Sequence, residues 1–383
     1  MINHFYRDTW AEIRLDYIER NIRNLRSILP ETTEIMAVVK ANAYGHGATF
    51  VAKEAVQLGC KFLAVAILDE ALQLRKNGIQ EPILVLGLTR PEYAPIAAKN
   101  KISLTVFQKD WIKQAESYLN NEQLNIHIKC DTGMGRIGLQ TVTELRELIE
   151  TIRSCKNIAI EGIFTHFAAA DSKNLHYYQY QLENFQHLLE SIDKKPKWIH
   201  ASNSAASLRF KESLFSIVRF GISMYGLSPS QEIKDELPFP LAEAFSLHSR
   251  LVHVKKVEKG TSISYGCTYT AKEDEWIGTI PIGYADGWTR KLEGQEVLVE
   301  GVRVPIVGRI CMDQCMIKLP GPLPIGTKVT LIGKQKEASI TIDEIAEKLN
   351  TINYEIPCMI SNRVPRVYLR GENMIGVSNP IIK

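Results

Sequence analysis

The chain has 383 residues, of which 45% are hydrophobic and 23% are charged. This balance is typical of a globular protein and excludes a disordered or fibrous one, and the length favours two domains over one. The formal net charge is +3, with acidic and basic residues interspersed and no basic block. The composition therefore gives no electrostatic footprint for nucleic acid.

The first residues, MINHFYRDTWAEI, resemble neither a secretory signal nor a transit peptide, and no apolar run reaches transmembrane length. Seven cysteines are scattered without a C-x-x-C pair, and the nine histidines show no metal-ligand spacing. We therefore expect a cytoplasmic protein with reduced thiols, no metal and no membrane contact.

Helical periodicity predicts an amphipathic helix over residues 15–29. Eight short apolar runs follow it, at 35–40, 62–67, 82–87, 102–106, 124–130, 158–164, 197–201 and 216–220. The helical stretches between them include 47–58, 69–77, 109–119, 141–154 and 174–192. Such alternation is typical of a parallel sheet, and eight strands predict closure into a (β/α)8 barrel of the TIM type.

The pattern changes after about residue 240, where β-branched residues and turn glycines dominate and only 343–349 has a helical pattern. We predict a mostly antiparallel β domain here. The fold class is thus α/β, with a barrel domain over residues 1–240 and a C-terminal β domain over 241–383. Residues 1–12 are expected to pack with the second domain.

The most informative stretch is AVVKANAYGHG, residues 37–47, in which an apolar strand delivers Lys40 at its C-terminal edge. Burying a lysine is unfavourable unless the amine is paired or has reacted. A neutral lysine here can form a Schiff base with a carbonyl compound or with pyridoxal phosphate. For an isolated lysine the better interpretation is an amine that reaches solvent from the strand end. The residues of the neighbouring loops are therefore needed to distinguish this interpretation from a Schiff-base lysine.

The active site of a closed barrel forms at the C-terminal ends of its strands. Other polar residues are predicted at this rim, namely Arg136 after the fifth run, His166 after the sixth, Ser202–Ser204 after the seventh and Arg219 with Gly221 at the eighth. The last two loops are where barrels commonly hold phosphate, and they offer a hydroxyl and backbone amides. A lysine on one side and a phosphate cradle on the other favour pyridoxal 5'-phosphate as the cofactor.

A competing motif is G-x-G-x-x-G, formed by Gly133, Gly135 and Gly138. It follows a strand and precedes a helix, as a dinucleotide site requires. It falls in the fifth strand unit rather than the first, however, and it leaves Lys40 without a role. We therefore prefer the pyridoxal phosphate hypothesis.

At this point the sequence resembles the alanine racemase family over essentially its whole length. The motifs that carry the resemblance, in family order, are AVVKANAYGHGA, DTGMGRIG, THFA, ASNSAASLRF, VRFGISMYGLSPS, SYGCTYTA, IGYADGW, VGRICMDQ and TINYEI. The resemblance implies a homodimeric enzyme that interconverts L- and D-alanine with pyridoxal 5'-phosphate. It also implies that D-alanine is supplied for peptidoglycan.

The resemblance also assigns roles to individual residues. Lys40 would hold the cofactor covalently, Arg219 would face its pyridine nitrogen with His166 beside it, and Arg136 would contact its phenolic oxygen and the substrate carboxylate. The phosphate would be held by Tyr44, Ser204, Gly221, Ile222 and Tyr354. Tyr265 would be the second base and would reach over from the partner subunit with the substrate-binding residues Met312 and Asp313. A carbamate on Lys129 would orient Arg136, whereas the alternative is a lysine that points to solvent.

Racemisation removes hydrogen from one face of the α-carbon and returns a proton to the other, so it requires a base on each face. We expect Lys40 to serve D-alanine and Tyr265 to serve L-alanine. Reference pKa values of about 10 for tyrosine and about 10.4 for lysine are too high for bases near neutrality. Desolvation helps the neutral lysine, and a positive field from Arg136, Arg219 and a protonated His166 could help the tyrosinate.

Arg219 bears on the type of reaction, because an arginine does not accept the proton of the ring nitrogen. An unprotonated ring favours reprotonation of the substrate over transamination. Alternative functions are a serine racemase or one of broader specificity, a decarboxylase of the same barrel family, and a non-catalytic barrel that binds pyridoxal phosphate. Two positions depart from the family pattern: Arg14 replaces an acid and Asn362 replaces an aromatic residue.

Overall fold

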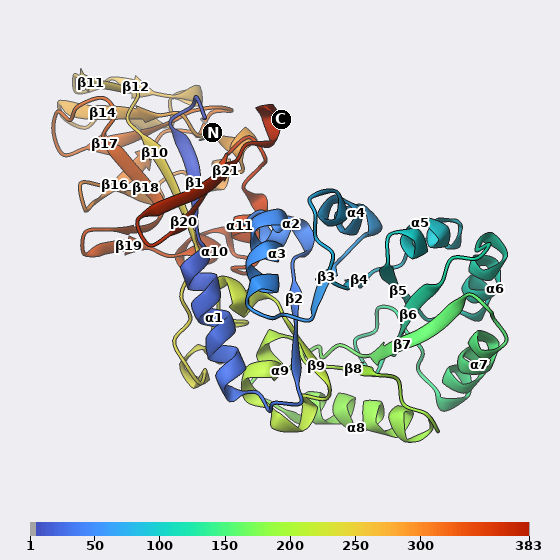
Figure 1. Cartoon of the computed structure of the whole chain (residues 1–383). Coiled ribbons are helices and arrows are strands. Elements are labelled where there is room, and N and C mark those ends of the chain that lie inside the picture. Colours follow the sequence, from blue (N-terminus) through green and yellow to red (C-terminus); the bar gives the residue numbers. More distant parts are fainter. Residues whose placement is uncertain (1–4, 383) are drawn as a thin grey trace. The chain divides into compact units, whose positions relative to one another are not determined.

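The computed structural model describes residues 5–382, and the chain divides into two compact units, each described by itself below (Figure 1). The barrel unit comprises residues 18–43 and 48–242. The sheet unit comprises the N-terminal residues up to 17, the short segment 44–47 and the residues from 243 on. Residues 1–4, for which packing with the second domain was expected, lie outside the described residues.

The barrel unit contains the eight predicted strands, all parallel. They are β2 (Glu34–Val38), β3 (Phe62–Val65), β4 (Ile83–Val85), β5 (Ile102–Val106), β6 (Leu124–Lys129), β7 (Ile158–Phe164), β8 (Trp198–His200) and β9 (Ile217–Phe220). Their order is β8-β7-β6-β5-β4-β3-β2-β9. Strands β8 and β9 form no ladder, but backbone bonds from Ser216 N to Ile199 O (3.2 Å) and from Arg219 N to Ser202 O (3.0 Å) cross the seam. The ring is thus nearly closed, and the predicted barrel is confirmed.

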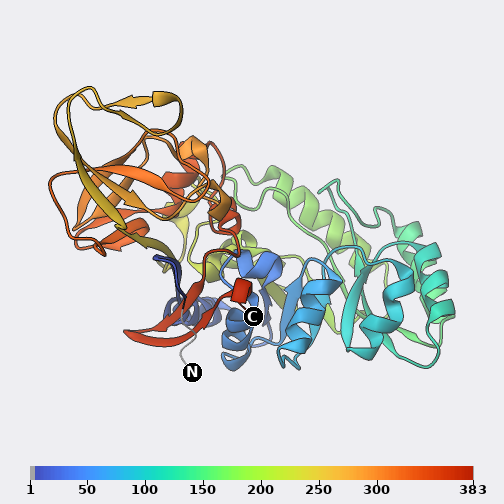
Figure 2. The same cartoon turned by 90° about the horizontal axis from the view of Figure 1, so that it is seen from above.

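The helices lie outside the ring of strands (Figures 1 and 2). Those between the strands are α3 (Ala48–Gln57), α4 (Leu68–Lys76), α5 (Ala94–Lys99), α6 (Lys109–Tyr118), α7 (Val142–Arg153), α8 (His176–Glu190) and α9 (Ser204–Arg209). The predicted first helix is α1 (Leu15–Ile28), whose Ile18, Ile22 and Leu25 are fully buried. That spacing of three and four residues is the reason why this segment is helical.

The sheet unit is built on an eleven-stranded sheet that is antiparallel except for one pair. Its strands are β1 (Thr9–Arg14), β10 (Phe245–Arg250), β11 (His253–Val257), β14 (Glu275–Ile280), β15 (Glu296–Val299), β16 (Val302–Val307), β17 (Cys315–Leu319), β18 (Lys328–Gln335), β19 (Ala338–Ile340), β20 (Arg366–Arg370) and β21 (Asn373–Ser378). Strand β1 pairs antiparallel with β10 and parallel with β20. The N-terminal strand is therefore an internal member of this sheet.

In the part of the sheet unit that the structure describes, two α-helices lie wholly within the unit, whereas one was predicted. Helix α10 (Ile342–Leu349) matches the helical pattern at 343–349, but α11 (Glu355–Met359) was not expected. It is one turn long and contains Pro357, so periodicity has too few residues to reveal it. Among the described residues, no helix is both long and apolar enough to cross a membrane.

The two departures from the family pattern are surface features. Arg14 donates to both carboxylate oxygens of Asp16, with its Nε at 3.1 Å and its Nη2 at 2.9 Å, and its guanidinium lies 4.7 Å from the centre of the Tyr17 ring. Asn362 is exposed. Arg14 thus has a local acidic partner of its own.

Candidate active site

Lys40 begins a strained turn directly after the first barrel strand. Strand β2 ends at Val38, and the turn α2 (Lys40–Tyr44) has left-handed backbone at Ala41, Asn42 and Ala43, with φ between 51° and 54°. Such residues are unfavourable by about 1–2 kcal/mol each when they are not glycine. Side chains hold the turn, because Glu70 Oε1 accepts from Ala41 N at 2.6 Å and Asn42 Oδ1 accepts from Ala48 N at 2.9 Å. Strain of this kind clusters at functional sites.

Arg219, on β9, places a cation inside the barrel. It is 3% exposed, and its Nη1 donates to His200 Nδ1 at 2.7 Å while its Nη2 donates to Ala201 O at 2.7 Å and Thr165 O at 2.9 Å. Burial, and then the charge of Arg136, lower the pKa of Arg219 to about 9, so the guanidinium stays charged at neutral pH. No carboxylate contacts it in the described part of the chain. Its remaining N–H groups are available to an acceptor such as a pyridine nitrogen.

His166, at the end of β7, is neutral and does not carry the expected positive charge. Burial lowers its pKa well below the ordinary value, and the cations Arg219, Lys129, Arg136 and Lys40 lower it further. Arg219 Nη2 approaches His166 Nδ1 at 3.1 Å. Because the guanidinium can only donate, Nδ1 is the acceptor and the imidazole proton lies on Nε2. The expectation of a protonated His166 was therefore wrong.

The glycine-rich loop after β6 folds around a carboxylate. Asp131 Oδ1 accepts from Gly135 N at 3.0 Å and from Gly133 N at 3.2 Å, and Tyr177 OH donates to Gly133 O at 2.7 Å. Two of the loop amides thus bind the Asp131 carboxylate and are not available to the phosphate of a dinucleotide. The loop instead presents Arg136, which is exposed and has no hydrogen-bond partner among residues 5–382.

Lys129 ends β6 and is buried at the rim, at 2% exposure. Its Nζ donates to Cys130 O at 2.7 Å and lies 5.2 Å from the centre of the Phe164 ring. Burial, and then the charge of Arg219, lower the pKa of Lys129 to about 8. A lysine that points to solvent is therefore excluded, and a large fraction of the amine is neutral and nucleophilic near pH 8.

The ends of β8 and β9 offer the features of a phosphate cradle. Ser204 begins α9, and its Oγ accepts from Gly221 N at 3.0 Å. The buried N–H of Ile222 has no acceptor among the described residues, which is unusual for a buried backbone donor. Asn203 caps α9 by accepting from Ala206 N at 3.1 Å, so an ordinary helix cap coexists with the cradle.

The other two residues that were predicted to bind the phosphate, Tyr44 and Tyr354, belong to the sheet unit. Tyr44 and Tyr354 have ring centroids 6.3 Å apart, and burial raises the pKa of Tyr44. Its hydroxyl is therefore protonated and can donate to an anion. Arg366, which is buried, donates to Gly45 O at 3.0 Å and anchors the segment that carries Tyr44.

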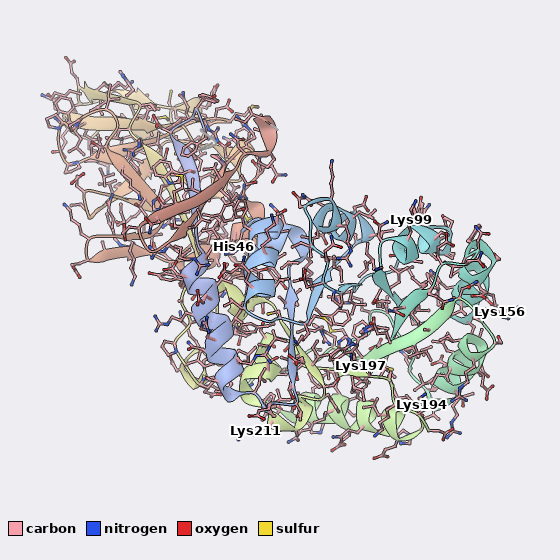
Figure 3. All side chains as sticks on the ribbon, in the orientation of Figure 1. His46, Lys99, Lys156, Lys194, Lys197 and Lys211 are labelled. Atoms are coloured by element: carbon pink, nitrogen blue, oxygen red, sulfur yellow. The ribbon has the colours of Figure 1, made fainter. Side chains whose placement is uncertain are left out.

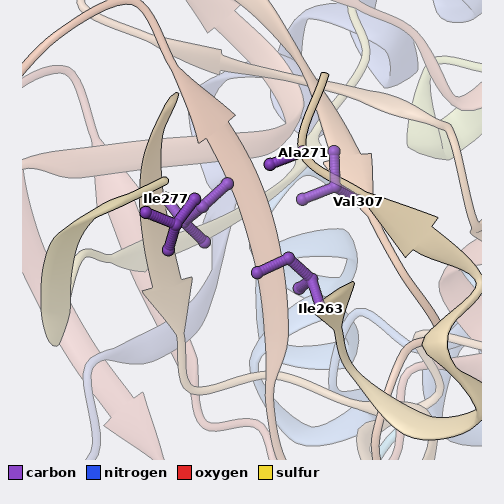
Figure 4. Packing of buried hydrophobic residues seen from close by; sticks show 5 residues of the cluster. Ile263, Ala271, Ile277 and Val307 are labelled. Atoms are coloured by element: carbon purple, nitrogen blue, oxygen red, sulfur yellow. The ribbon is translucent and has the colours of Figure 1, made fainter. Parts of the chain in front are cut away.

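Tyr265 lies at the tip of a hairpin in the sheet unit, between β12 (Ser262–Ile263) and β13 (Tyr269–Thr270). Its side chain is 72% exposed, whereas the base of the hairpin is held by a buried cluster of Val257, Ile263, Ala271, Ile277 and Val307 (Figure 4). Ser264 Oγ also donates to Arg309 O at 2.6 Å. The phenol is thus presented to solvent on a rigid support.

Met312 and Asp313 lie on a neighbouring loop of the same unit. Met312 is 53% exposed, and its carbonyl accepts from Ala285 N at 3.1 Å. Asp313 Oδ1 accepts from Arg363 Nη2 at 2.7 Å. Both side chains are therefore displayed on the surface of the sheet unit, as Tyr265 is.

The predicted site residues thus fall into two groups. The barrel unit carries its group at the C-terminal ends of its strands, comprising Lys40, Lys129, Arg136, His166, Ser204, Arg219, Gly221 and Ile222. The sheet unit carries Tyr44, Tyr265, Met312, Asp313 and Tyr354. A rim lysine, a buried cation and a neutral cradle fit pyridoxal 5'-phosphate, and together with the barrel they define the class of barrel enzymes that use this cofactor.

Comparison with known proteins narrows the class to a family. The profile of the alanine racemase N-terminal domain matches residues 13–229, and that of the C-terminal domain matches 244–368. The chain is 56% identical to the alanine racemase of Geobacillus stearothermophilus over 381 residues, which is 99% of this chain and 98% of that protein. The chain belongs to the alanine racemase family and is a racemase that uses pyridoxal 5'-phosphate.

Solved structures agree with this assignment. Alanine racemase from Bacillus anthracis, with bound L-Ala-P, superimposes with a TM-score of 0.96 at 49% identity over 99% of both chains. A histidine racemase from Leuconostoc mesenteroides superimposes with a TM-score of 0.90 at 33% identity, over 96% of this chain and 100% of that one. The fold is therefore shared with racemases named for different amino acids.

Sequence reasoning missed several residues that the structure links to Arg219. They are His200, His127 and Glu161, which form a hydrogen-bonded row in the barrel interior. The available signal was a polar residue between two apolar ones in a predicted barrel strand, as at His127 between Ile126 and Ile128. It was weak, because a buried histidine usually has a structural role.

Lys129 provides the first test. We expect its neutral amine to react with carbon dioxide, forming an N–C bond and releasing one proton, to give a carbamate. The negative charge of the carbamate would be stabilised by Arg136. In ¹³C NMR with labelled bicarbonate near pH 8, we expect a carbamate resonance from the native protein and none from Lys129→Gln. An equal signal from both proteins, or none from either, would leave Lys129 as an unmodified amine.

Proposed function

We propose that the protein interconverts L-alanine and D-alanine with two bases, Lys40 and Tyr265. The observation that carries the proposal is the set of hydrogen bonds around Arg219. Its buried guanidinium donates to an imidazole and to carbonyls rather than to a carboxylate. Pyridoxal phosphate, when bound, makes the α-hydrogen of an attached amino acid acidic. An arginine at the ring nitrogen leaves that nitrogen unprotonated, which favours return of a proton to the α-carbon.

Each residue then has a defined task. Lys40 Nζ holds the cofactor between turnovers and exchanges a proton on one face of the α-carbon. Tyr265 Oη exchanges a proton on the other face. Arg136, which is exposed and without a hydrogen-bond partner among residues 5–382, binds the substrate carboxylate, and Arg219 faces the ring nitrogen of the cofactor.

Tyr265 is supplied by the partner subunit of a homodimer in this proposal. Support comes from the apolar character of the surface around it, where Tyr265, Met312 and Tyr284 are 72%, 53% and 42% exposed. The loops of Tyr284 and Met312 are joined by the bond from Tyr284 N to Cys311 O, at 3.0 Å. Large apolar side chains gathered on a surface are typical of a protein interface.

A second candidate is a racemase for another amino acid or for several. It is favoured by the similarity to the Leuconostoc histidine racemase. The comparison of kcat/KM for alanine, serine and histidine separates the two, since the proposal expects alanine to be the best substrate.

Exchange of the α-hydrogen in deuterated water tests the two bases. The native protein should exchange the α-hydrogen of both enantiomers, whereas Tyr265→Ala should lose exchange of L-alanine by about 10²-fold or more and keep exchange of D-alanine, as expected when a positioned acid–base group is removed. ¹H NMR follows the loss of the α-proton signal. Tyr269→Phe is the matched control, because Tyr269 lies on the same hairpin and donates to Glu275.

The two outcomes that contradict the proposal differ in meaning. Equal loss for both enantiomers in Tyr265→Ala would remove the assignment of one base to each face. Bound cofactor without exchange in the native protein would instead support a non-catalytic binding protein.

The shared site can be tested by mixing two inactive variants. If Tyr265 serves the partner's Lys40, a heterodimer of Lys40→Ala and Tyr265→Ala chains contains one complete site and one site lacking both bases. Co-expression should then restore about one quarter of native activity, from the random pairing of the two chains that a symmetric dimer allows. No recovery, with a dimer present by light scattering, would place both bases in one chain.

We further propose that the D-alanine is used for peptidoglycan in the cytoplasm of a bacterium, supported by the bacterial sources of the relatives. The gene is therefore expected to restore growth, without added D-alanine, to a bacterium that lacks its own racemase. The Lys40→Ala variant should not do so. Growth that still requires D-alanine, with native protein expressed and folded, would contradict this role.

A further inference from the structure

A row of polar side chains runs from Arg219 through the interior of the barrel. Arg219 Nη1 lies 2.7 Å from His200 Nδ1, His200 Nε2 lies 2.9 Å from His127 Nδ1, and His127 Nε2 lies 3.3 Å from Glu161 Oε2. Ser103 Oγ donates to the same Glu161 oxygen at 2.6 Å. The row joins β9, β8, β6, β7 and β5 and ends on a carboxylate.

The direction of every bond in the row follows from its two ends. Arg219 can only donate, so His200 Nδ1 accepts and the proton of that ring is on Nε2. His200 Nε2 therefore donates to His127 Nδ1, and the proton of His127 is on Nε2, where ionised Glu161 accepts it. Both imidazoles are neutral in this arrangement, and each has one tautomer.

The rings have little freedom to move. His127 and His200 are fully buried, and Phe164 stacks on His200 with centroids 4.6 Å apart and planes at 8°. Phe62 meets His127 edge-on at 5.7 Å. Gly162 leaves the space for His127, because a Cβ at this position would lie 2.4 Å from His127 Nδ1.

The charges at the two ends complement each other. Burial alone would raise the pKa of Glu161, but hydrogen bonds from His127 and Ser103 lower it, so the carboxylate is ionised. Lys197, which also favours this ionised state, lies just before β8 at the N-terminal end of the strands (Figure 3). Burial lowers the pKa of His127 and, more strongly, of His200. Two neutral imidazoles thus lie between the buried guanidinium of Arg219 and the carboxylate of Glu161.

We propose that Glu161 is a positioning residue of the racemase: acting through His127 and His200, it fixes the orientation of the Arg219 guanidinium and serves as its remote counter-ion. This inference rests on the proposed function, in which Arg219 faces the cofactor. A carboxylate in direct contact would neutralise the guanidinium and compete for its donors. Two intervening imidazoles leave the free N–H groups of Arg219 for the cofactor while the buried charge is still balanced.

A purely structural role of Glu161 predicts a different result. In that case Glu161 only provides a partner for buried polar groups, and its loss would lower stability without changing the imidazole tautomers. The positioning role requires a hydrogen-bond acceptor at residue 161, because without one the proton on His127 Nε2 has no partner. Both tautomers can then reverse, at the expense of the bond from Arg219 to His200.

The test uses full-length protein, loaded with pyridoxal phosphate and labelled with ¹⁵N-histidine. The variants are Glu161→Ala, which removes the acceptor, and Glu161→Gln, which keeps an acceptor and removes the charge. Glu116→Gln is the matched control, because Glu116 is a half-buried carboxylate on α6 that accepts from Lys156 N at 2.9 Å and from Asn157 N at 3.3 Å, without contacting an imidazole. The ¹⁵N shifts of His127 and His200, the visible absorption of the bound cofactor, and kcat and KM for both alanine enantiomers are measured.

We expect Glu161→Ala to give mixed tautomers at His127 and His200, a shifted cofactor absorption, and kcat lower by about 10-fold or more with little change in KM, as when a residue that orients a functional imidazole is lost. Glu161→Gln should keep the tautomers and recover part of kcat. The Glu116→Gln control should match the native protein in all three readouts.

The proposal is overturned if Glu161→Ala keeps native ¹⁵N shifts, or if Glu161→Gln is no better than Glu161→Ala in tautomers and kcat. The tautomers do not depend on turnover, so the two hypotheses can fail separately. Native protein that binds cofactor but does not racemise would remove the proposed function, whereas normal racemisation with unchanged tautomers in Glu161→Ala would remove only this inference.

Discussion

A cation held inside the barrel, with no carboxylate of residues 5–382 in contact with it, is the constraint on which the rest of the site depends. Burying a guanidinium is unfavourable unless its hydrogen bonds are made, and Arg219 makes them to two carbonyls and two imidazoles. Each imidazole must then offer a lone pair, so His166 and His200 are neutral. Burial, and then the same cation, lower the pKa of Lys129. Burial and one buried charge thus act together on the protonation of three neighbouring groups.

The two proposed bases are held in very different ways, and both ways restrict motion. Lys40 begins a left-handed turn whose strain is offset by hydrogen bonds to Glu70 and Asn42. Tyr265 stands at the tip of a hairpin whose base is anchored in a small apolar cluster. Proton transfer depends on the placement of the acceptor, so local rigidity at both positions is what a racemase of this kind needs.

Much of the fold follows from sequence, because alternating apolar runs and amphipathic stretches are local signals and β2 to β9 coincide with the eight runs. The five-residue helix α11 and the turn at Ala41–Tyr44 were not predictable, since one is too short for periodicity and the other contains no glycine at its left-handed positions. The charge of His166 depends on neighbours distant in sequence. Glu161 escaped notice because it lies at the shift of register between β6 and β7, where His127 pairs with Gly162. Strict alternation would place it on the face opposite Gly162.

The side chains in the barrel interior give the final argument that the row from Arg219 to Glu161 has a function. Barrel interiors are normally packed with branched apolar side chains, and replacing a buried charged network by apolar residues is often neutral or stabilising. His127, His200 and Arg219 occupy such positions here and are fully or almost fully buried, and Gly162 makes room for the ring of His127. Stability alone therefore gives no reason for these residues. A reason is the need to hold one guanidinium, charged and correctly oriented, at the mouth where the lysine lies.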